Sequence, residues 1–533
     1  MADIIDEANR SENTQPQGRN IGGTSRGQGN NIGEQPVREP RVSADVDETS
    51  PLFLRPDDPR VTPYNVHAVR LIHSVLAVLG ILSFIWFMML LIDSFVSFGL
   101  VDTRGSGFLE IVFTLVSLVS LSISLIFFTA PSAADRVIGY GTCAFLFLDL
   151  VLILLVPTFN HRNGGFVGLL TVLGTLAVIF LTTVADHIVE KGKAHEEERL
   201  TGRVEDRRAL SEWFSVAASV ILRAVLFVIV ALISFNLFLE VYDSVFLKPE
   251  GELISIGEGV GKYSVQLYCT DTDRDVQRKT VIVEGGETSG ADVASWVLDL
   301  YHLNKVDRVC YWDRPGVGFS DNAPSPQSIG MTADALSEAL ANYFDLDSTP
   351  MVLVSHGIGG LYSRVFASRH PSLVKSLLLI DTLHEDLFYK RNSQWKGFKL
   401  WVGGLWSTLG LDQFTGLIVY GQGPWARTYG PGQHYQARYY KTLLQEQVGA
   451  RGLSRNEIVA ANALLPRDTA IAVVTSAEMI EKFKFWSELQ RRLTKLSDYN
   501  LAWKILDGPH EVWRNTKSRK QLQELLTDLF EYV

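Results

Sequence analysis

Apolar residues are distributed unevenly along this chain, and five long apolar runs lie between residues 66 and 249. They cover approximately residues 71–92, 108–130, 137–157, 166–185 and 214–239. Each run is close to the length of about 20 residues that a helix needs to cross a bilayer. The pattern therefore predicts a multi-span transmembrane region over residues 66–249, with the lipid bilayer as its partner.

The segment before these runs is polar. Residues 1–65 are rich in Gly, Asn, Gln, Pro, Arg and Glu. Such a segment cannot bury enough apolar surface to offset the entropy lost on ordering. It is predicted to be a disordered tail.

Basic residues predict how the spans are oriented. The segment 186–213 and the approach to the first span are rich in Lys and Arg, whereas the loops on the other side hold Arg104 and Arg162. Basic residues favour the side of the membrane on which the chain is synthesised. With five spans, this rule places the N-terminus inside and the C-terminal domain on the opposite side.

Two ionisable residues interrupt the spans: Asp149 in the third and Arg223 in the fifth. They could form an intramembrane pair or a proton path. Alternatively, Arg223 reaches the interface, and Asp149 is protonated or hydrogen-bonded to a neighbouring helix. We favour the second interpretation.

Residues 250–533 have a different pattern, in which continuous apolar runs alternate with amphipathic helical runs. TVIVEGG, RVCYWDRPG and PMVLVSHGIGG are examples of the apolar runs. The alternation predicts a mostly parallel sheet covered by helices on both faces. Ligands of such sheets bind beyond the carboxyl ends of the strands.

The turns after these strands resemble those of the α/β-hydrolase family. RVCYWDRPGVGFSD (308–321) is close to the family's Tyr-Asp-Arg-Pro-Gly-x-Gly-x-Ser run. VLVSHGIGGLYSRVFASRHP (352–371) is similar to the strand, turn and helix of its nucleophile elbow. LLLIDTLHED and ILDGPHEVW resemble the segments that carry the acid and the histidine. The resemblance covers most of residues 260–533. It implies an α/β-hydrolase fold with a helical lid at about residues 382–469.

The elbow departs from the family pattern G-x-S-x-G, because the central position of Ser355-His356-Gly357-Ile358-Gly359 is a glycine. Glycine offers no nucleophile. The resemblance implies the other roles: His510 is the base, Asp381 or Glu478 is its acid, and Gly285, Gly286 and Ile358 form the oxyanion hole. His356 could assist, because it stands beside the elbow glycine.

A second resemblance concerns the whole arrangement. Five spans, a hydrolase-like domain and the segment SPLFLRPDDPRVTPYNVHAVRLI are similar to a fungal family of mitochondrial integral membrane proteins. This implies a mitochondrial membrane, with another endomembrane left open.

Composition narrows the possible functions. A net charge of -10 argues against nucleic-acid binding. Three cysteines cannot form a disulfide framework or a four-thiolate zinc site, and no metal or other cofactor is expected. The family's strand order makes the strands of Cys269 and Cys310 neighbours, and we expect two reduced thiols there rather than a disulfide.

Three functions stay open. The domain is a degenerate hydrolase that binds an apolar ligand or a partner protein at the membrane, or an ester or lipid hydrolase that uses His510 with water or an unusual nucleophile. The third possible function is that of a transporter or membrane scaffold, which the five spans would carry. Gly357 favours the first.

Overall fold

The computed structural model describes residues 61–97, 99, 105–156, 165–204, 210–271, 278–343, 349–391 and 393–532. Residues 1–60 of the predicted tail lie outside the described residues. Its last residues join the folded part, because a 3₁₀ turn, η1 (Pro63–Asn65), begins after Thr62. The Thr62 hydroxyl accepts a hydrogen bond from the Tyr64 N–H at 3.4 Å.

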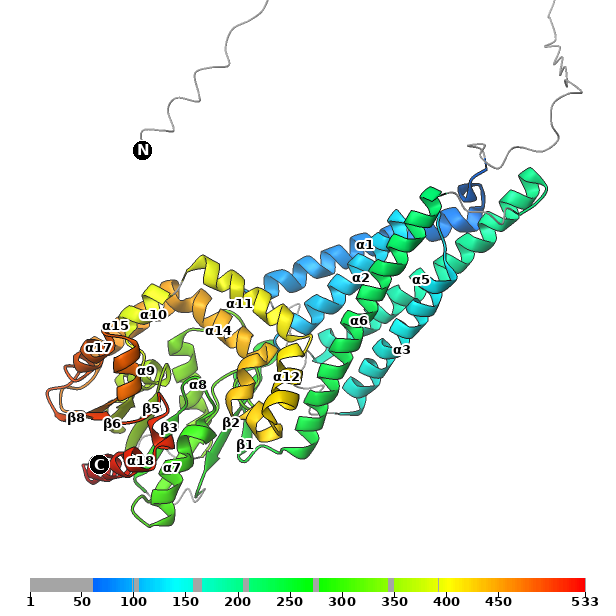
Figure 1. Cartoon of the computed structure of the whole chain (residues 1–533). Helices are drawn as coiled ribbons and strands as arrows, with labels where there is room; N and C mark the ends of the chain where they lie inside the picture. Colours follow the sequence, from blue (N-terminus) through cyan, green and yellow to red (C-terminus); the bar gives the residue numbers. More distant parts are fainter. Residues whose placement is uncertain are drawn as a thin grey trace, which may run out of the picture. The chain divides into compact units, whose positions relative to one another are not determined.

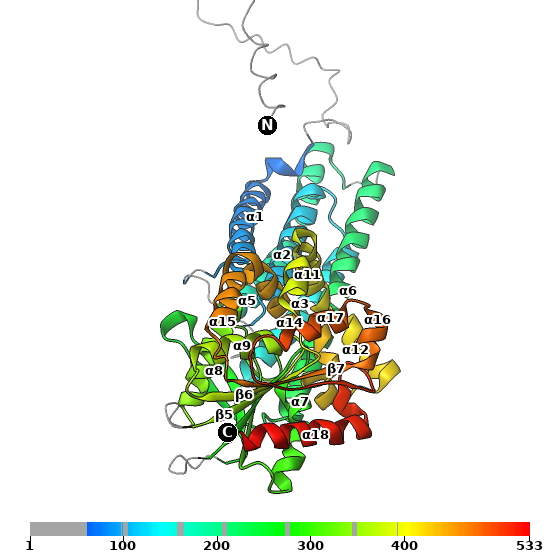
Figure 2. The same ribbon diagram turned by 90° about the vertical axis from the view of Figure 1, so that its left-hand side faces the viewer.

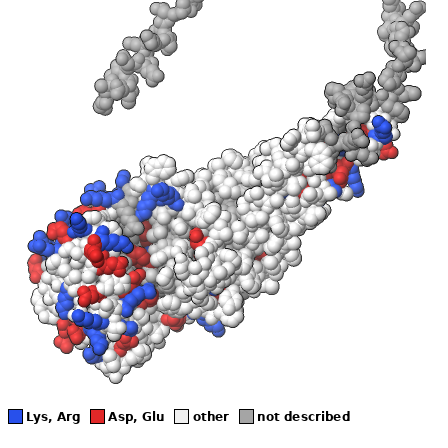
Figure 3. All heavy atoms as spheres, viewed as in Figure 1, with Lys and Arg blue, Asp and Glu red and all other residues white. Residues whose placement is uncertain are grey.

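Among the described residues, five helices are long and apolar enough to cross a membrane, as predicted (Figure 1). They are α1 (His67–Asp93), α2 (Phe108–Ile126), α3 (Ala133–Leu155), α5 (Gly165–Thr201) and α6 (Leu210–Phe246). Their surface is mostly uncharged in the view of Figure 3. Hydroxyls bond between the helices: Ser117 donates to Thr175 at 3.0 Å, which suits helices packed in lipid.

Helices α5 and α6 extend beyond their predicted spans. The added part of α5 is charged but helical, because its Glu, Lys and Ala residues are strong helix formers. Lys193 of α5 donates to Glu212 of α6 at 2.7 Å, and Asn65 donates to Glu196 of α5 at 2.8 Å. The start of α1, the end of α5 and the start of α6 therefore lie at one end of the bundle.

The C-terminal domain contains an eight-stranded sheet in the order β1-β2-β4-β3-β5-β6-β7-β8. The pairs β1–β2 and β2–β4 are antiparallel, and the others are parallel. The predicted α/β-hydrolase fold is confirmed. The strands are β1 (Glu252–Ile256), β2 (Tyr263–Cys269), β3 (Thr280–Glu284), β4 (Arg308–Trp312), β5 (Met351–His356), β6 (Val374–Ile380), β7 (Ala470–Ser476) and β8 (Asn500–Leu506).

Helices cover both faces of the sheet, and the central strands are therefore buried on both sides (Figure 2). On one face, α7 (Gly290–His302) and α18 (Thr516–Glu531) pack in one apolar cluster. On the other, α8 (Ile329–Ala341) and α9 (Gly359–Arg369) pack in a second cluster. Two short helices, α16 (Ala477–Lys482) and α17 (Trp486–Leu493), follow β7, and the 3₁₀ turns η2 (Gly259–Gly261) and η5 (Val512–Arg514) precede β2 and α18.

A helical lid lies between β6 and β7, where the resemblance predicted it. Its elements are α10 (Glu385–Arg391), α11 (Gln394–Ser407), α12 (Leu411–Tyr420), α13 (Pro424–Thr428), η3 (Pro431–Tyr435), α14 (Ala437–Gly449), a π-helical turn η4 (Ala450–Ser454) and α15 (Arg455–Leu464).

Buried polar contacts join the lid to the apolar helices. The Arg427 guanidinium of α13 forms a two-pronged ion pair with Asp243 of α6, and both side chains are nearly inaccessible to solvent. Lys441 of α14 donates to the backbone carbonyls of Asp93 and Ser94, at the end of α1. Lid and bundle therefore share a desolvated polar interface.

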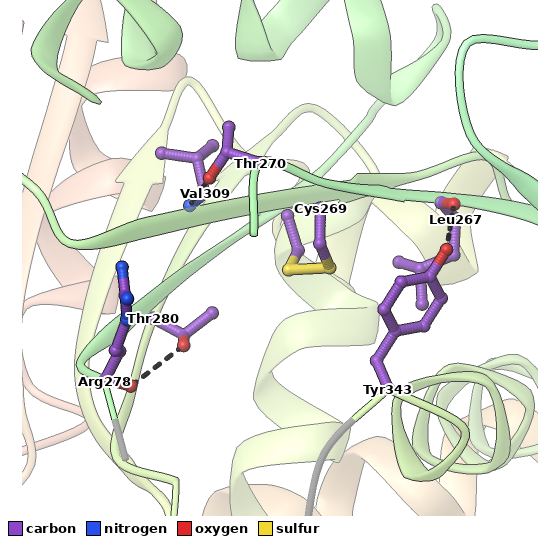
Figure 4. Close-up of a disulfide and its surroundings, with 8 residues drawn as sticks. Leu267, Cys269, Thr270, Arg278, Thr280, Val309 and Tyr343 are labelled. Atoms are coloured by element: carbon purple, nitrogen blue, oxygen red, sulfur yellow. Dashed lines mark hydrogen bonds between the residues drawn. A yellow bond between two sulfur atoms is a disulfide. The ribbon is translucent and has the colours of Figure 1, made fainter. Parts of the chain in front are cut away.

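The structure joins Cys269 of β2 and Cys310 of β4 in a disulfide (Figure 4). The expectation of two reduced thiols is wrong. The two residues are direct partners in the antiparallel β2–β4 register, with Cα atoms 4.1 Å apart. The resemblance implied that these strands are neighbours, but only the register places the sulfur atoms face to face.

We predict that Asp243→Asn lowers the free energy of unfolding of the full chain by about 3 kcal/mol, because it leaves the buried Arg427 charge unpaired. Chemical unfolding in detergent micelles measures the effect. Asp386→Asn is the matched control, because it breaks a half-exposed pair with Arg492 and should cost about 0.5 kcal/mol or less. Equal costs for the two variants would contradict the prediction.

Candidate active site

The turn after β5 has the geometry of a nucleophile elbow but carries no nucleophile. Gly357 adopts φ +54°, between β5 and α9. Its N–H donates to the Ile380 carbonyl at 3.3 Å, and its own carbonyl accepts from the Leu383 N–H at 2.8 Å. A left-handed backbone favours glycine. The sequence alone shows the missing side chain, and the structure shows what takes its place.

A carboxylate occupies the space above Gly357. A Cβ atom built on this residue would lie 2.1 Å from Oε2 of Glu287. Glu287 follows β3 in the loop EGGET, which approaches the elbow closely: a Cβ on Gly286 would lie 2.6 Å from the His356 carbonyl. The parallel register pairs the ends of β3 and β5, Glu284 with Ser355, and so brings the loop beside the elbow.

His510 and Asp381 form the second part of the site. Asp381 follows β6 and is fully buried. Its Oδ2 lies 3.0 Å from Nδ1 of His510. Its carboxylate also accepts from Ser476 and from the Trp486 indole, at 2.7 Å for the latter. Nε2 of His510 lies 3.6 Å from Oε2 of Glu287.

Of the two predicted acids, only Asp381 meets the histidine. Glu478 lies at the start of α16 and is exposed, and its backbone N–H donates to the Gly508 carbonyl at 3.4 Å. Among the described residues, no ion pair or hydrogen bond joins the Glu478 carboxylate to His510.

His356, the last residue of β5, completes the cluster. Its ring centroid lies 4.2 Å from that of His510, and Trp513 contacts it edge-on at 4.8 Å. Its Nε2 donates to the His510 backbone carbonyl at 3.3 Å, and its Nδ1 lies 3.9 Å from Oε2 of Glu287. The side chain is 1% exposed.

The electrostatics differ from those of a general base. Burial alone would lower the pKa of His510, but its interactions with Asp381 and Glu287 outweigh burial and raise that pKa to about 10. Burial would raise the pKa of Glu287, yet the neighbouring histidines hold it well below its usual range. Burial and the charge on His510 lower the pKa of His356 to about 4. At neutral pH the protein alone holds a charged His510 between two carboxylates.

The predicted oxyanion-hole residues surround this cluster. Ile358 caps α9 directly after the elbow, and Gly285 and Gly286 lie in the Glu287 loop. The Arg314 guanidinium donates to the Gly286 carbonyl and fixes that peptide group. Their role as an oxyanion hole stays a prediction.

Lid residues hold the same loop. His434 of η3 lies 3.0 Å through Nε2 from the Glu287 carbonyl. Arg314 lies 3.4 Å from the Glu446 carboxylate of α14, which also accepts from the Tyr362 hydroxyl at 2.8 Å. The position of the Glu287 loop therefore depends on the lid.

A cavity of about 470 Å³ opens at the cluster, within the usual size range of ligand pockets. Glu287, Gly357, Asp381 and His510 line its polar end. Most of its wall is apolar and comes from the turn after β6, from α10 and from the segment after β7: Leu383, Leu387, Met479, Phe483, Phe485 and Trp486, with Lys390 beside them.

Comparison with known proteins identifies two regions. Residues 34–269 match a region of unknown function (DUF2417), and residues 281–411 match the α/β hydrolase fold family. An uncharacterized protein of Schizosaccharomyces pombe is 30% identical over 475 residues, which cover 83% of this chain and 87% of that protein. The chain belongs to the family of this fission-yeast protein.

Two further relatives are informative. An uncharacterized vacuolar membrane protein of Saccharomyces cerevisiae is 26% identical over 558 residues, which cover 85% of this chain and 86% of that protein. A (lyso)-N-acylphosphatidylethanolamine lipase of Bos taurus is 26% identical over 144 residues, which cover 27% of this chain and 41% of the lipase. The family therefore includes a vacuolar membrane protein, and the expected mitochondrial location has no support.

The two intramembrane residues do not meet. Asp149 accepts a hydrogen bond from Ser234 of α6 at 2.8 Å, as the favoured interpretation expected. Arg223 is buried between helices, where it pairs with Asp186 at 2.9 Å and with Asp135 at 3.9 Å. Among the described ion pairs, none joins Asp149 to Arg223.

Sequence reasoning missed Glu287. The available signal was its place directly after the two glycines of EGGET, in a turn at the carboxyl end of a strand. No family motif points to it. Only the close approach of this loop to Gly357 shows its importance.

We predict that Glu284 makes the protein less stable as pH rises. Burial raises the pKa of Glu284 from 4.5 to about 8. The hydrogen bond that the Trp312 indole donates to it at 2.5 Å lowers the pKa but does not outweigh burial. Between these values the folded state keeps a proton that the unfolded state releases, and stability therefore falls with rising pH. Glu284→Gln should remove about 2–4 kcal/mol of this loss.

Urea unfolding of the full chain at pH 5 and pH 8.5 measures the difference. The variant and the wild type should be similar at pH 5, and the variant should be the more stable at pH 8.5. Parallel losses in the two proteins would show that Glu284 is not the responsible group.

Proposed function

We propose that this chain is a membrane-anchored α/β-hydrolase-fold protein that binds the acyl part of a lipid in the 470 Å³ cavity and forms no acyl-serine intermediate. One observation carries the proposal: the Glu287 carboxylate fills the place of the nucleophile, at the polar end of an apolar cavity.

The cavity and the lid suit a lipid. Leucine, methionine and aromatic side chains dominate the cavity wall. On the lid, α11 packs with Phe108 of the bundle on one side and exposes Trp395, Phe398 and Trp406 on its surface. Exposed tryptophan next to membrane helices favours the bilayer interface. The similarity to a lipase that acts on a phospholipid class agrees with this ligand.

The site is unsuited to serine-type catalysis. That mechanism needs a hydroxyl and a neutral imidazole that accepts its proton. Gly357 provides no hydroxyl, and His510 is held as a cation between Glu287 and Asp381.

Hydrolysis by an activated water is the second candidate. Glu287, His356 and His510 direct polar atoms to one point beside the cavity. A water bound there would lie next to the polar end of an acyl ligand.

We also propose a vacuolar membrane with the C-terminal domain in the lumen. The basic C-terminal end of α5 and the basic residues before α1 favour the cytoplasmic side. The Cys269–Cys310 disulfide favours an oxidising compartment for the sheet. The vacuolar relative supports the organelle.

We predict saturable binding of a dansyl-labelled fatty acid to the full chain in lipid nanodiscs. Leu387→Trp should weaken binding at least about tenfold, because the larger side chain fills the cavity. Ile418→Trp, on the exposed face of α12, should have no effect. A fluorophosphonate probe should label none of these proteins.

Two results would contradict the proposal. Equal binding by Leu387→Trp and the wild type would place the acyl chain outside this cavity. Fluorophosphonate labelling of the wild type would reveal an activated serine.

We predict that a C-terminal tag resists protease in sealed vacuolar vesicles and is digested once detergent is added, whereas an N-terminal tag is digested at once. An endogenous lumenal protein serves as the control for sealed membranes. The reverse pattern would overturn the proposed orientation.

A further inference from the structure

Three side chains converge beneath the cavity from separate parts of the fold. Glu287 comes from the loop after β3, His356 from the end of β5, and His510 from the loop after β8. Oε2 of Glu287 lies 3.9 Å from Nδ1 of His356 and 3.6 Å from Nε2 of His510, and one ligand atom from each residue lies within 4.8 Å of the others.

We infer that Glu287, His356 and His510 bind a divalent transition-metal ion of the zinc class. Zinc sites that act on bound ligands have three protein ligands of the His and Glu type and one open position. With metal–ligand bonds of 2.0–2.1 Å, tetrahedral ligand atoms lie about 3.3–3.4 Å apart. The Glu287–His510 and Glu287–His356 separations of 3.6 and 3.9 Å exceed this value by roughly 0.3 and 0.6 Å, and the ligand nitrogens of the two histidines lie within 4.8 Å of each other. The three side chains would therefore move inward on binding the ion.

The hydrogen bonds leave the correct nitrogen free on each ring. Nδ1 of His510 donates to Asp381, and Nε2 points toward Glu287, where a bound ion would replace the proton that Nε2 carries in the protein alone. Nε2 of His356 donates to the His510 carbonyl, and its Nδ1 presents a lone pair toward the same oxygen. Metal-binding histidines usually donate their second ring N–H to a carboxylate or a backbone carbonyl.

Two of the three ligand atoms lack a hydrogen-bond partner. Nδ1 of His356 and Oε2 of Glu287 are both out of solvent and unpaired in this way, although they face each other. A buried polar atom without a partner costs free energy. A cation between them would satisfy both.

Charge and space also favour a cation. Glu287 and the fully buried Asp381 are two carboxylates beside two imidazoles, and a divalent ion cancels their charge. Gly357 leaves room, because a side chain there would displace the Glu287 carboxylate. Since Glu287 and His510 also line the cavity, an acyl ligand would lie next to the ion. The metal site does not depend on that ligand.

The test uses the full chain without a histidine tag, in detergent, after treatment with a chelator. Titration with Co²⁺ should give the visible absorption of a tetrahedral ion at one equivalent, and Zn²⁺ should displace it. Glu287→Gln and His510→Gln should each weaken Co²⁺ binding at least about 100-fold. Asp381→Asn, which removes a carboxylate charge and the acceptor of the His510 hydrogen bond, should weaken it about 10–100-fold.

His384→Gln is the matched control. His384 is buried beside Glu385 and Asp386 but lies outside the cluster, and its loss should leave Co²⁺ binding unchanged. Thermal unfolding without metal shows whether each variant is folded, and added Zn²⁺ should raise the melting temperature of the wild type but not of Glu287→Gln.

Absence of the tetrahedral spectrum, or equal affinity in the wild type and Glu287→Gln, would overturn the metal site and leave an ion pair of Glu287 with His510. If the protein binds the dansyl fatty acid but does not bind Co²⁺, only the metal site is contradicted. If the protein binds Co²⁺ but does not bind the fatty acid, only the proposed acyl ligand is contradicted.

Discussion

The left-handed backbone at Gly357 is the constraint on which the rest of the site depends. In a serine hydrolase this conformation carries a side chain that points into the site. Here the turn keeps its shape, and the space beside Gly357 is filled by the Glu287 carboxylate from the loop after β3. Gly357 cannot gain a side chain while Glu287 stays in place, because a Cβ atom would lie 2.1 Å from Oε2 of Glu287. The site has therefore lost the side chain at the elbow and gained a carboxylate in the same space.

The lid connects this site to the membrane helices through desolvated polar contacts. Lys441 and Glu446 lie on the same helix, α14, and face the end of α1 and the Arg314 guanidinium respectively. Arg314 in turn holds the Gly286 carbonyl beside Glu287. Because unpaired buried charges are costly, these contacts favour one relative position of bundle, lid and loop. A shift of α1 in the bilayer would therefore change the position of the Glu287 loop.

The fold could be predicted from the sequence because its strand-end motifs are local. Gly357, Asp381 and His510 each follow or lie near an apolar run that is readable by itself. The rest needed distances between elements far apart in the chain. The choice of Asp381 over Glu478, the contact of Glu287 with the elbow and the pairing of Arg223 with Asp186 are of this kind.

The disulfide was predicted wrongly for a similar reason. Neighbouring strands can be slid by one residue without changing their order, and one residue of shift turns side chains to opposite faces. Cys269 and Cys310 face each other only in the register that the structure shows. The apolar spans were the clearest prediction, because length and hydropathy suffice to indicate them.

The disulfide also joins the two regions that match different families. Cys269 is the last residue of the region of unknown function, and Cys310 lies within the α/β hydrolase match. The first region contributes β1 and β2 to a sheet whose other strands belong to the second part of the chain. Recombination that exchanged one half alone would remove two strands and leave one sulfur unpaired. The boundary between the two matched regions therefore does not coincide with a boundary of the folded sheet.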